Sequence, residues 1–406
     1  MSRFRILFAT GTLCLALTQL NAQGAAAPHP SPASVDLPAM KPDPEHPLMP
    51  IGTVAPHFAL KGVDDKIHTL AEFSNAKLLV VIFESIHCPV SENYESRIRE
   101  LYDTYNGKGV AFVAINPNNP VAVRLDELGY TDLTDSPADM KIRVREQQIP
   151  WPYLYDGETQ EVVQKFGAVA TPHVFIFDRD RKLRYEGRID DNQNQALVKV
   201  HDARDAIDAL LAGGTVAVAH RPAFGCSTKW LSKSKDVARE WRTIMAEPVV
   251  LTQASLADVN ALRANAGDNV TVVHFWSTGT QNVERDFSDL ETTYRMFRGR
   301  AYDFVTVNGD SSANTAKTAE FLKAQHASSR NLQISPADLD AIQTAFGSKW
   351  RADEEYTVVI APHGKIVYAR EGPIDILDVR HAALSSFTDN PYFPGQSQYW
   401  AHFAIH

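Results

Sequence analysis

The chain has 406 residues, of which 44% are hydrophobic and 22% charged, and its formal net charge is −9. This length suggests two or three globular domains, and the composition excludes a disordered or fibrous protein. The acidic balance also makes nucleic acid a poor partner, because such a chain repels a phosphate backbone. The three cysteines, Cys14, Cys88 and Cys226, are too few for a disulfide scaffold, so we treat them as candidates for chemistry.

Residues 1–22 have the pattern of a secretory signal peptide, with two arginines followed by an apolar run. The run is too short and too interrupted to span a bilayer, which takes about 20 apolar residues, so we expect no stable membrane span. Cys14 would be removed with this segment. We therefore expect export to the periplasm, an oxidising compartment in which Cys88 and Cys226 are the remaining thiols.

Eight prolines between residues 23 and 50 predict an extended linker, because proline fixes φ and lacks an N–H donor. Residues 51–211 then alternate between strand and helix patterns. The expected strands are 78–83, 110–115 (ended by Asn116-Pro117-Asn118), 173–177 and 183–187, and the expected helices are 92–105, 159–166 and 194–211. Thr159 is the expected N-cap of the second helix. This alternation indicates an α/β fold with a mostly parallel central sheet flanked by helices.

The same order of elements returns after a connecting segment at 212–245. The matching strands are expected at 270–276, 304–308, 357–360 and 365–368, with a helix through 287–297. Two unrelated α/β domains would look alike at this level, but matched details at the first strand end and the late hairpin favour duplication. The sequence therefore predicts tandem domains, with 246–388 as the second domain and 389–406 as an aromatic tail.

Cys88 stands where the first apolar strand stops and a helix begins. The orphan N–H groups and the dipole of a helix start favour the thiolate, which is the nucleophilic form. Ser85 can donate a hydroxyl hydrogen bond to the sulfur, and His87 can add a positive charge. Glu84 either relays a proton to Cys88 or merely ends the strand in water. The alternative for Cys88 itself is an inert buried cysteine.

The strand, the turn at 85–89 and Thr171-Pro172 before a later strand together resemble the thioredoxin fold. Residues 51–230 more closely resemble the AhpC/TSA (redoxin) superfamily, which is related to peroxiredoxins. The serine and cysteine of the turn match the peroxiredoxin-like arrangement, in which the cysteine attacks peroxide. The resemblance implies a cis Thr171–Pro172 bond that faces the sulfur and exposes a backbone edge able to pair with an extended peptide.

The chain departs from the peroxiredoxin pattern at two places. Peroxiredoxins carry a proline seven residues before the reactive cysteine, where this chain has Val81. They also carry an arginine near the start of the late strand, where this chain has Pro172 or His173. Arg97, on the helix after Cys88, is the candidate substitute for that arginine, unless it faces solvent.

Cys226 lies in the motif Phe-Gly-Cys-Ser-Thr-Lys-Trp at 224–230, and related redoxin-like proteins carry a similar ending. Peroxide would convert Cys88 to a sulfenic acid, with which a second thiol condenses to release water. Cys226 is the only second thiol once the leader is removed, so we expect it to resolve Cys88. The alternative is a free thiol that never meets Cys88.

Metal chemistry is a rival interpretation. His87, Cys88 and His173 could converge as a copper or zinc set. Copper-delivering proteins of the thioredoxin fold usually carry two closely spaced cysteines, which this chain lacks, so we expect no metal and no cofactor. In the second domain Thr280 and Val283 occupy the two cysteine positions of the thioredoxin turn, so no thiol chemistry is expected there.

The leading interpretation is an exported antioxidant oxidoreductase that reduces hydroperoxides. The predicted site comprises Cys88, Cys226, Ser85 and Pro172, supported by His87, Thr171, Arg97 and Glu84. Exchange of disulfides on protein substrates is the first alternative, and a non-enzymatic thioredoxin-fold binding or scaffold protein is the second. In either enzymatic interpretation the partner is a thiol electron donor, such as a thioredoxin-like reductant.

Overall fold

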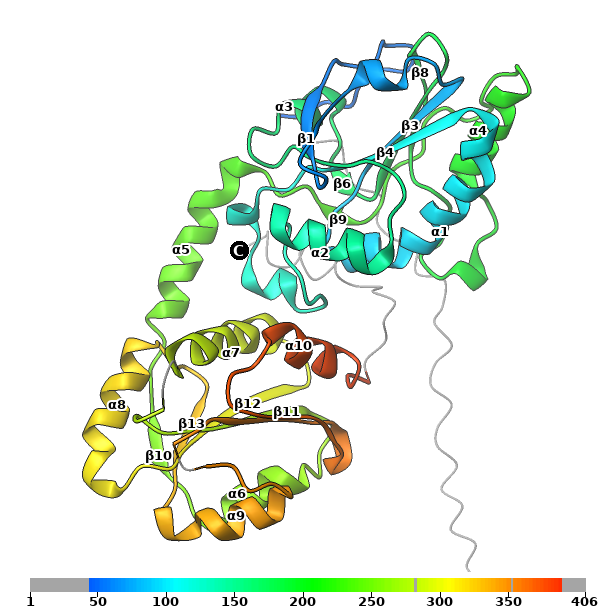
Figure 1. Ribbon diagram of the computed structural model, residues 1–406. Helices are drawn as coiled ribbons and strands as arrows, with labels where there is room; N and C mark the ends of the chain where they lie inside the picture. The colour runs from blue at the N-terminus through cyan, green and yellow to red at the C-terminus, as the bar shows by residue number, and fades with distance from the viewer. Residues whose placement is uncertain (1–43, 281–282, 352, 389–406) are drawn as a thin grey trace, which may run out of the picture. The chain divides into compact units, whose positions relative to one another are not determined.

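The computed structural model describes residues 44–280, 283–351 and 353–388 (Figure 1). The predicted signal peptide, most of the proline-rich linker and the aromatic tail lie outside these residues. Within them, no helix combines the length and the apolar character that a membrane span requires.

The first half of the chain forms a seven-stranded sheet in the order β2-β1-β5-β4-β3-β7-β8. Its strands are β1 (Ala59–Gly62), β2 (Ile67–Thr69), β3 (Leu78–Phe83), β4 (Val110–Asn116), β5 (Tyr153–Tyr155), β7 (His173–Phe177) and β8 (Leu183–Gly187). The pairs β3–β4 and β4–β5 are parallel, and the other four are antiparallel. The sheet is thus mixed rather than mostly parallel, and short connections return the chain as the hairpins β1–β2 and β7–β8 at its two ends.

Helices flank this sheet: α1 (Pro89–Tyr105), α2 (Pro137–Gln147), α3 (Glu161–Phe166) and α4 (Asp202–Leu211). The expected closing helix is shorter than predicted, because residues 195–197 form only a 3-10 turn and Val198 is extended. The predicted N-cap Thr159 is also wrong. Gln160 precedes α3, and the carboxylate of Asp156 accepts the N–H groups of Val162 and Val163 at 3.3 and 2.7 Å.

Strand β3 is buried on both faces, as its continuous apolar run predicts. Its even-numbered residues pack in the cluster that also holds Cys88, Cys226 and the apolar face of α1. Its odd-numbered residues pack in a second cluster with Phe166 and Trp230. The strand therefore ends in the middle of the core, and the turn that follows it begins in a buried position.

The second half repeats this plan in a six-stranded sheet of order β10-β13-β12-β11-β14-β15. Its strands are β10 (Leu251–Gln253), β11 (Val270–Trp276), β12 (Tyr302–Asn308), β13 (Arg330–Gln333), β14 (Tyr356–Ile360) and β15 (Ile366–Glu371). The helices after residue 233 are α5 (Ser234–Met245), α6 (Leu256–Ala264), α7 (Val283–Phe297), α8 (Thr315–Ala324), α9 (Leu339–Phe346) and α10 (Ile376–Leu384). In both sheets the first long strand lies between a parallel neighbour and an antiparallel hairpin, as duplication predicts.

A third, two-stranded sheet decides where the second cysteine lies. Strand β6 (Ala170–Thr171) pairs antiparallel with β9 (Cys226–Ser227), and the register sets Thr171 opposite Cys226. Figure 1 shows the two short strands side by side in the first half of the molecule. Segments 55 residues apart are thereby joined next to the end of β3, where the site is found.

Candidate active site

Cys88 is the N-cap residue of α1, directly after the turn that leaves β3. Pro89 occupies the first helical position, where its fixed φ suits the helix and its missing N–H costs nothing. The Cys88 sulfur accepts a hydrogen bond from the backbone N–H of Ser91 at 3.4 Å, and the residue is fully buried. The prediction that Cys88 lies at a helix start is thus confirmed, and backbone N–H groups of the first turn, which have no partner within the helix, face the sulfur.

The structure brings Cys226 into hydrogen-bonding contact with Cys88, although 138 positions separate them in the sequence. The Cys88 sulfur also lies 3.2 Å from the carbonyl oxygen of Thr171, to which it can donate while it is a thiol. The Thr171–Pro172 bond is cis, as the resemblance implied. The two sulfurs and the proline turn therefore form one buried cluster, and neither cysteine forms a disulfide.

Gly225 makes the close approach of the second cysteine possible. Its φ is +152°, and a Cβ at this position would lie 2.0 Å from the Thr171 carbonyl oxygen and 3.3 Å from Pro172. A side chain would therefore force β9 away from β6, because the oxygen belongs to backbone and cannot rotate aside.

We expect Gly225→Ala to separate the two thiols and to slow formation of a Cys88–Cys226 disulfide by about tenfold or more, because a shift of one ångström misplaces reacting atoms. Diamide oxidation followed by non-reducing peptide mapping measures this rate. Gly214→Ala is a matched control, since Gly214 is exposed and the nearest atom to its added Cβ is the Ala209 carbonyl oxygen, 3.3 Å away. Equal rates in wild type and Gly225→Ala would contradict the prediction.

The two cysteines are held in different protonation states. Burial alone would raise the pKa of Cys88, but the hydrogen bond from Cys226, the charge on His87 and the Ser91 N–H lower it to about 6. The hydrogen bond that Cys226 donates, together with burial, raises the pKa of Cys226 well above its ordinary value. The geometry therefore makes Cys88 a thiolate near neutral pH and keeps Cys226 protonated.

The positive charge beside the thiolate depends on Asp135. Its carboxylate accepts hydrogen bonds from His87 Nδ1, from the Ile86 N–H at 2.8 Å, and from the side-chain amides of Asn116 at 3.0 Å and Asn118 at 2.9 Å. Burial would raise the pKa of Asp135, but the His87 charge and these hydrogen bonds lower it to about 2. The carboxylate in turn raises the pKa of His87 against the effect of burial. The imidazolium is thus stabilised inside the core.

Sequence reasoning missed Asp135. It lies in the loop before α2, 47 positions after Cys88, and no local pattern connects the two. The sequence does hold one signal for this group, because Asn116 ends the otherwise apolar strand β4, Asn118 follows it, and both side chains are buried. Buried side-chain amides need hydrogen-bond partners, so their position at the end of β4 could have pointed to a polar group nearby.

Ser85 and Glu84 do not behave as the sequence suggested. The Ser85 hydroxyl lies 3.4 Å from His87 Nδ1. The sulfur takes its hydrogen bonds from the Ser91 N–H and from Cys226 instead, because an N-cap side chain faces the N–H groups of its own helix. Glu84 does not end the strand in water. It is 2% exposed and its carboxylate oxygens lack hydrogen-bond partners. Burial and the charge on Glu95 raise the pKa of Glu84 well above its ordinary value.

Arg97, the candidate substitute for the peroxiredoxin arginine, is engaged by other partners. Its guanidinium binds both carboxylate oxygens of Asp190 at 2.8 and 2.7 Å and the carbonyl oxygens of Asn192 and Gln193. It also lies over the ring of Tyr94, 4.2 Å from the centroid. A buried ion pair of this kind fixes the arginine in place, which argues against a role as the substitute arginine.

The proposed metal set does not assemble either. His87 is bound to Asp135, and His173 Nε2 is bound to Glu186 at 2.7 Å. Among the residues that the structure describes, the one cluster of three potential ligands is Asp132, Glu146 and His381, which includes neither cysteine. The copper or zinc interpretation of the Cys88 region therefore has no support in the geometry.

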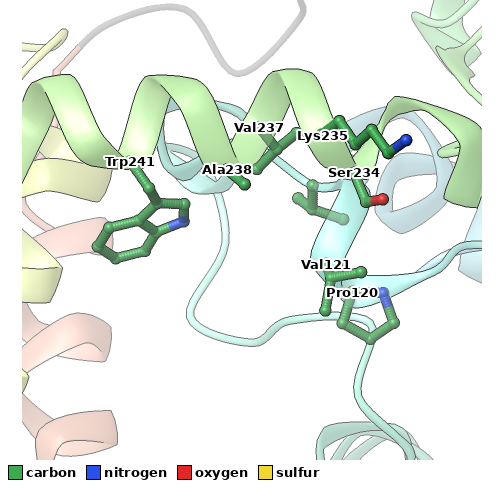
Figure 2. Close-up of a pocket in the computed structure, with 8 residues that line it drawn as sticks. Pro120, Val121, Ser234, Lys235, Val237, Ala238 and Trp241 are labelled. Carbon is green, nitrogen blue, oxygen red and sulfur yellow. The ribbon is translucent and has the colours of Figure 1, made fainter.

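Two surface hollows lie away from the cysteines. A groove of about 510 Å³ lies between the 3-10 turn Pro120–Ala122 and α5, with Val237 and Trp241 among its lining residues (Figure 2). A second hollow, of about 520 Å³, is lined by residues of β1 and α2. Neither is lined by Cys88 or Cys226, so the candidate active site is the buried thiol cluster.

Cys88 is an activated cysteine at a strand-to-helix junction, and it lies beside a cis proline in a domain whose sheet is flanked by helices. This combination defines a thioredoxin-fold thiol protein. Residues 51–186 match the model of the AhpC/TSA family. These residues therefore form a redoxin domain of the thioredoxin-fold superfamily, as the sequence motifs indicated.

The chain is 25% identical over 138 residues to the thiol-disulfide oxidoreductase ResA of Bacillus cereus and to that of Bacillus thuringiensis. This match covers 34% of the chain and 69% of each relative. An uncharacterized conserved protein from Geobacillus kaustophilus is 39% identical, with 45% of this chain and 92% of that chain covered and a TM-score of 0.40. A hypothetical protein from Sinorhizobium meliloti is 33% identical, with 45% and 96% covered and a TM-score of 0.41. The family model and the two ResA relatives support, at a coarse level, a thioredoxin-like oxidoreductase.

Proposed function

We propose that the chain is a thiol-disulfide oxidoreductase whose redox pair is Cys88 and Cys226. The observation that carries this proposal is the hydrogen-bonded contact of two buried thiols beside a cis proline. Cys88 is activated while Cys226 remains protonated, which suits a nucleophile and a resolving thiol. The similarity to two proteins named thiol-disulfide oxidoreductase supports the same chemistry.

The proposed reaction has two exchanges. The Cys88 thiolate attacks one sulfur of a substrate disulfide, the substrate S–S bond breaks, and a mixed disulfide forms while the first substrate thiolate leaves and is protonated by water. Cys226 then attacks the Cys88 sulfur as a thiolate, which forms as its proton passes to the departing substrate sulfur. The Cys88–Cys226 disulfide forms, and the second substrate thiolate departs with the proton of Cys226. The substrate gains two electrons, and an external thiol donor later returns two electrons to the protein.

Hydroperoxide reduction is the second candidate, and the activated Cys88 with a resolving thiol beside it is the observation that favours it. The thiolate would attack the peroxide, release the alcohol or water and become a sulfenic acid, which Cys226 would convert to a disulfide with loss of water. The engagement of Arg97 with Asp190 counts against it, because this guanidinium is not available to hold a peroxide.

Stopped-flow oxidation of the reduced protein distinguishes the two candidates. We expect 2-hydroxyethyl disulfide to produce the Cys88–Cys226 disulfide in a single turnover, faster than hydrogen peroxide at the same concentration. Quenching with N-ethylmaleimide and peptide mass analysis measures both products. Rapid reaction with peroxide alone would support the second candidate, and reaction with neither oxidant would leave only a binding or scaffold role.

We also propose that this chemistry takes place after export. The proposal rests on the arginines and the apolar run of residues 1–22. An oxidising compartment would supply disulfides as substrates and would require the thiol donor named above. Fractionation of cells that express the full chain tests it, and a cytoplasmic protein that retains residues 1–22 would contradict it.

A further inference from the structure

Residues 219–231 are called the strap, because this segment is bound along its length to β8, to β6 and to side chains of the first half. At its start, the Glu186 N–H donates to the Ala219 carbonyl at 2.9 Å and the Arg221 N–H donates to the Glu186 carbonyl at 3.0 Å. In its middle, β9 pairs with β6. The strap thus joins the outer strand β8 to the turn that carries Pro172.

The end of the strap is anchored by buried polar groups. The Lys229 N–H donates to the side chain of Asn118 at 2.7 Å, and its ammonium donates to Glu127 at 2.6 Å. Gln160 binds the Lys229 carbonyl at 2.9 Å and the Leu231 N–H at 2.7 Å. Buried groups satisfied in this way are costly to expose one at a time. The strap is therefore a fixed part of the reduced protein.

Apolar and hydroxyl contacts add to this anchoring. Trp230 is buried and stacks on His46 with 3.6 Å between ring centroids. Thr228 donates its N–H to the Val169 carbonyl at 3.1 Å and its hydroxyl to the Ala168 carbonyl at 2.8 Å. The last contacts extend the pairing of β9 beyond β6, so the main chain at 168–171 is covered continuously.

The strap occupies the edge that a polypeptide substrate would need. An extended peptide binds a sheet edge through main-chain hydrogen bonds, and β6 is the edge next to the Cys88 sulfur. Here the chain's own β9 already forms those bonds. Displacing it would also remove Cys226, which lies in β9, so a polypeptide that gained the edge would separate the resolving thiol from Cys88.

We propose that the strap makes the thiol pair selective for small disulfides and excludes polypeptide disulfides from the β6 edge. The inference rests on the proposed function, since it names the substrate class of the same two thiols. A small disulfide needs only a local movement of the strap near Gly225, and Cys226 stays close enough to resolve the mixed disulfide. A folded or extended polypeptide needs the whole of β9 displaced.

The test compares two disulfides in the reduced full chain. Single-turnover rates are measured with 2-hydroxyethyl disulfide and with insulin, and each is divided by the rate of free glutathione with the same disulfide to remove intrinsic reactivity. We expect the normalised rate with the small disulfide to exceed that with insulin by about tenfold or more, because each displaced hydrogen bond adds to the insulin barrier. Equal normalised rates would overturn the inference and leave the proposed function standing. Reaction with neither disulfide would overturn the proposed function itself.

A variant with a loosened strap gives an independent measurement. Thr228→Val combined with Trp230→Ala removes one hydrogen bond and one buried ring. It should raise the insulin rate by about tenfold while the small-disulfide rate stays within about threefold. Trp350→Ala is the matched control, because it removes another buried indole, from a core cluster of the second half. An insulin rate that stays unchanged in a folded strap variant, or that rises equally in the control, would contradict the inference.

Discussion

Replacing Cys226 with serine is expected to stop the reaction with a small disulfide at the mixed disulfide on Cys88. The Cys88 thiolate still attacks, because the serine hydroxyl donates a hydrogen bond in place of the thiol. No second sulfur is then available to release the bound half of the substrate. We expect the rate of multiple turnover to fall by about a hundredfold or more. A thiol from another molecule must then resolve the mixed disulfide, and the rate advantage of a thiol held beside Cys88 is lost. Intact-protein mass analysis would show one substrate half on each chain.

Two matched variants complete this experiment. Cys88→Ser should form no adduct with the small disulfide, because the activated nucleophile is gone. Ser227→Ala should cycle like wild type, since its main chain keeps the pairing with Ala170 and Lys229 keeps Glu127 when it loses the Ser227 hydroxyl. A Cys226→Ser protein that turns over at the wild-type rate would show that the resolving thiol comes from another molecule.

Asp135→Asn is expected to raise the pKa of Cys88 from about 6 toward the ~8.5 of a free thiol. A neutral amide cannot balance a buried imidazolium, so His87 loses its charge and the thiolate loses a stabilising neighbour. Below pH 7 the alkylation rate of Cys88 should fall by about tenfold or more, while at high pH it should approach the wild-type rate.

The alkylation profile against pH separates this role from a purely structural one. Loss of packing alone would lower stability without moving the midpoint of the profile. Asp139→Asn is the matched control, because its carboxylate binds the Thr134 N–H at 2.8 Å and has no contact with His87. An unchanged midpoint in Asp135→Asn would contradict the role assigned to the imidazolium.

The same shift should appear in the stability of the reduced protein. The pKa of Cys88 is lower in the folded state than in the unfolded chain. Its contribution is therefore present above the unfolded value of ~8.5 and is lost as pH falls toward about 6. Between these pH values the unfolding free energy of wild type should rise with pH more steeply than that of Asp135→Asn. Urea denaturation across this window measures the difference.

Local sequence patterns determined the elements that carry the nucleophile. The apolar run at 78–83 predicted a doubly buried strand, and the residues after it predicted a helix start with Cys88 at its first turn. The motifs around Cys88 and Pro172 identified the fold family, because these features depend on neighbours in the chain. The repeat of strand order in the second half was visible for the same reason.

Only the tertiary structure decided which distant groups meet the sulfur. Asp135 reaches His87 from a loop, Arg97 is taken by Asp190, and the register of β6 with β9 sets Cys226 beside Cys88. No periodicity or spacing encodes such pairings, since they depend on how the elements pack after they form. The mixed direction of the first sheet has the same origin. Local propensities define single strands, whereas the connections and the packed core decide which strands pair and in which sense.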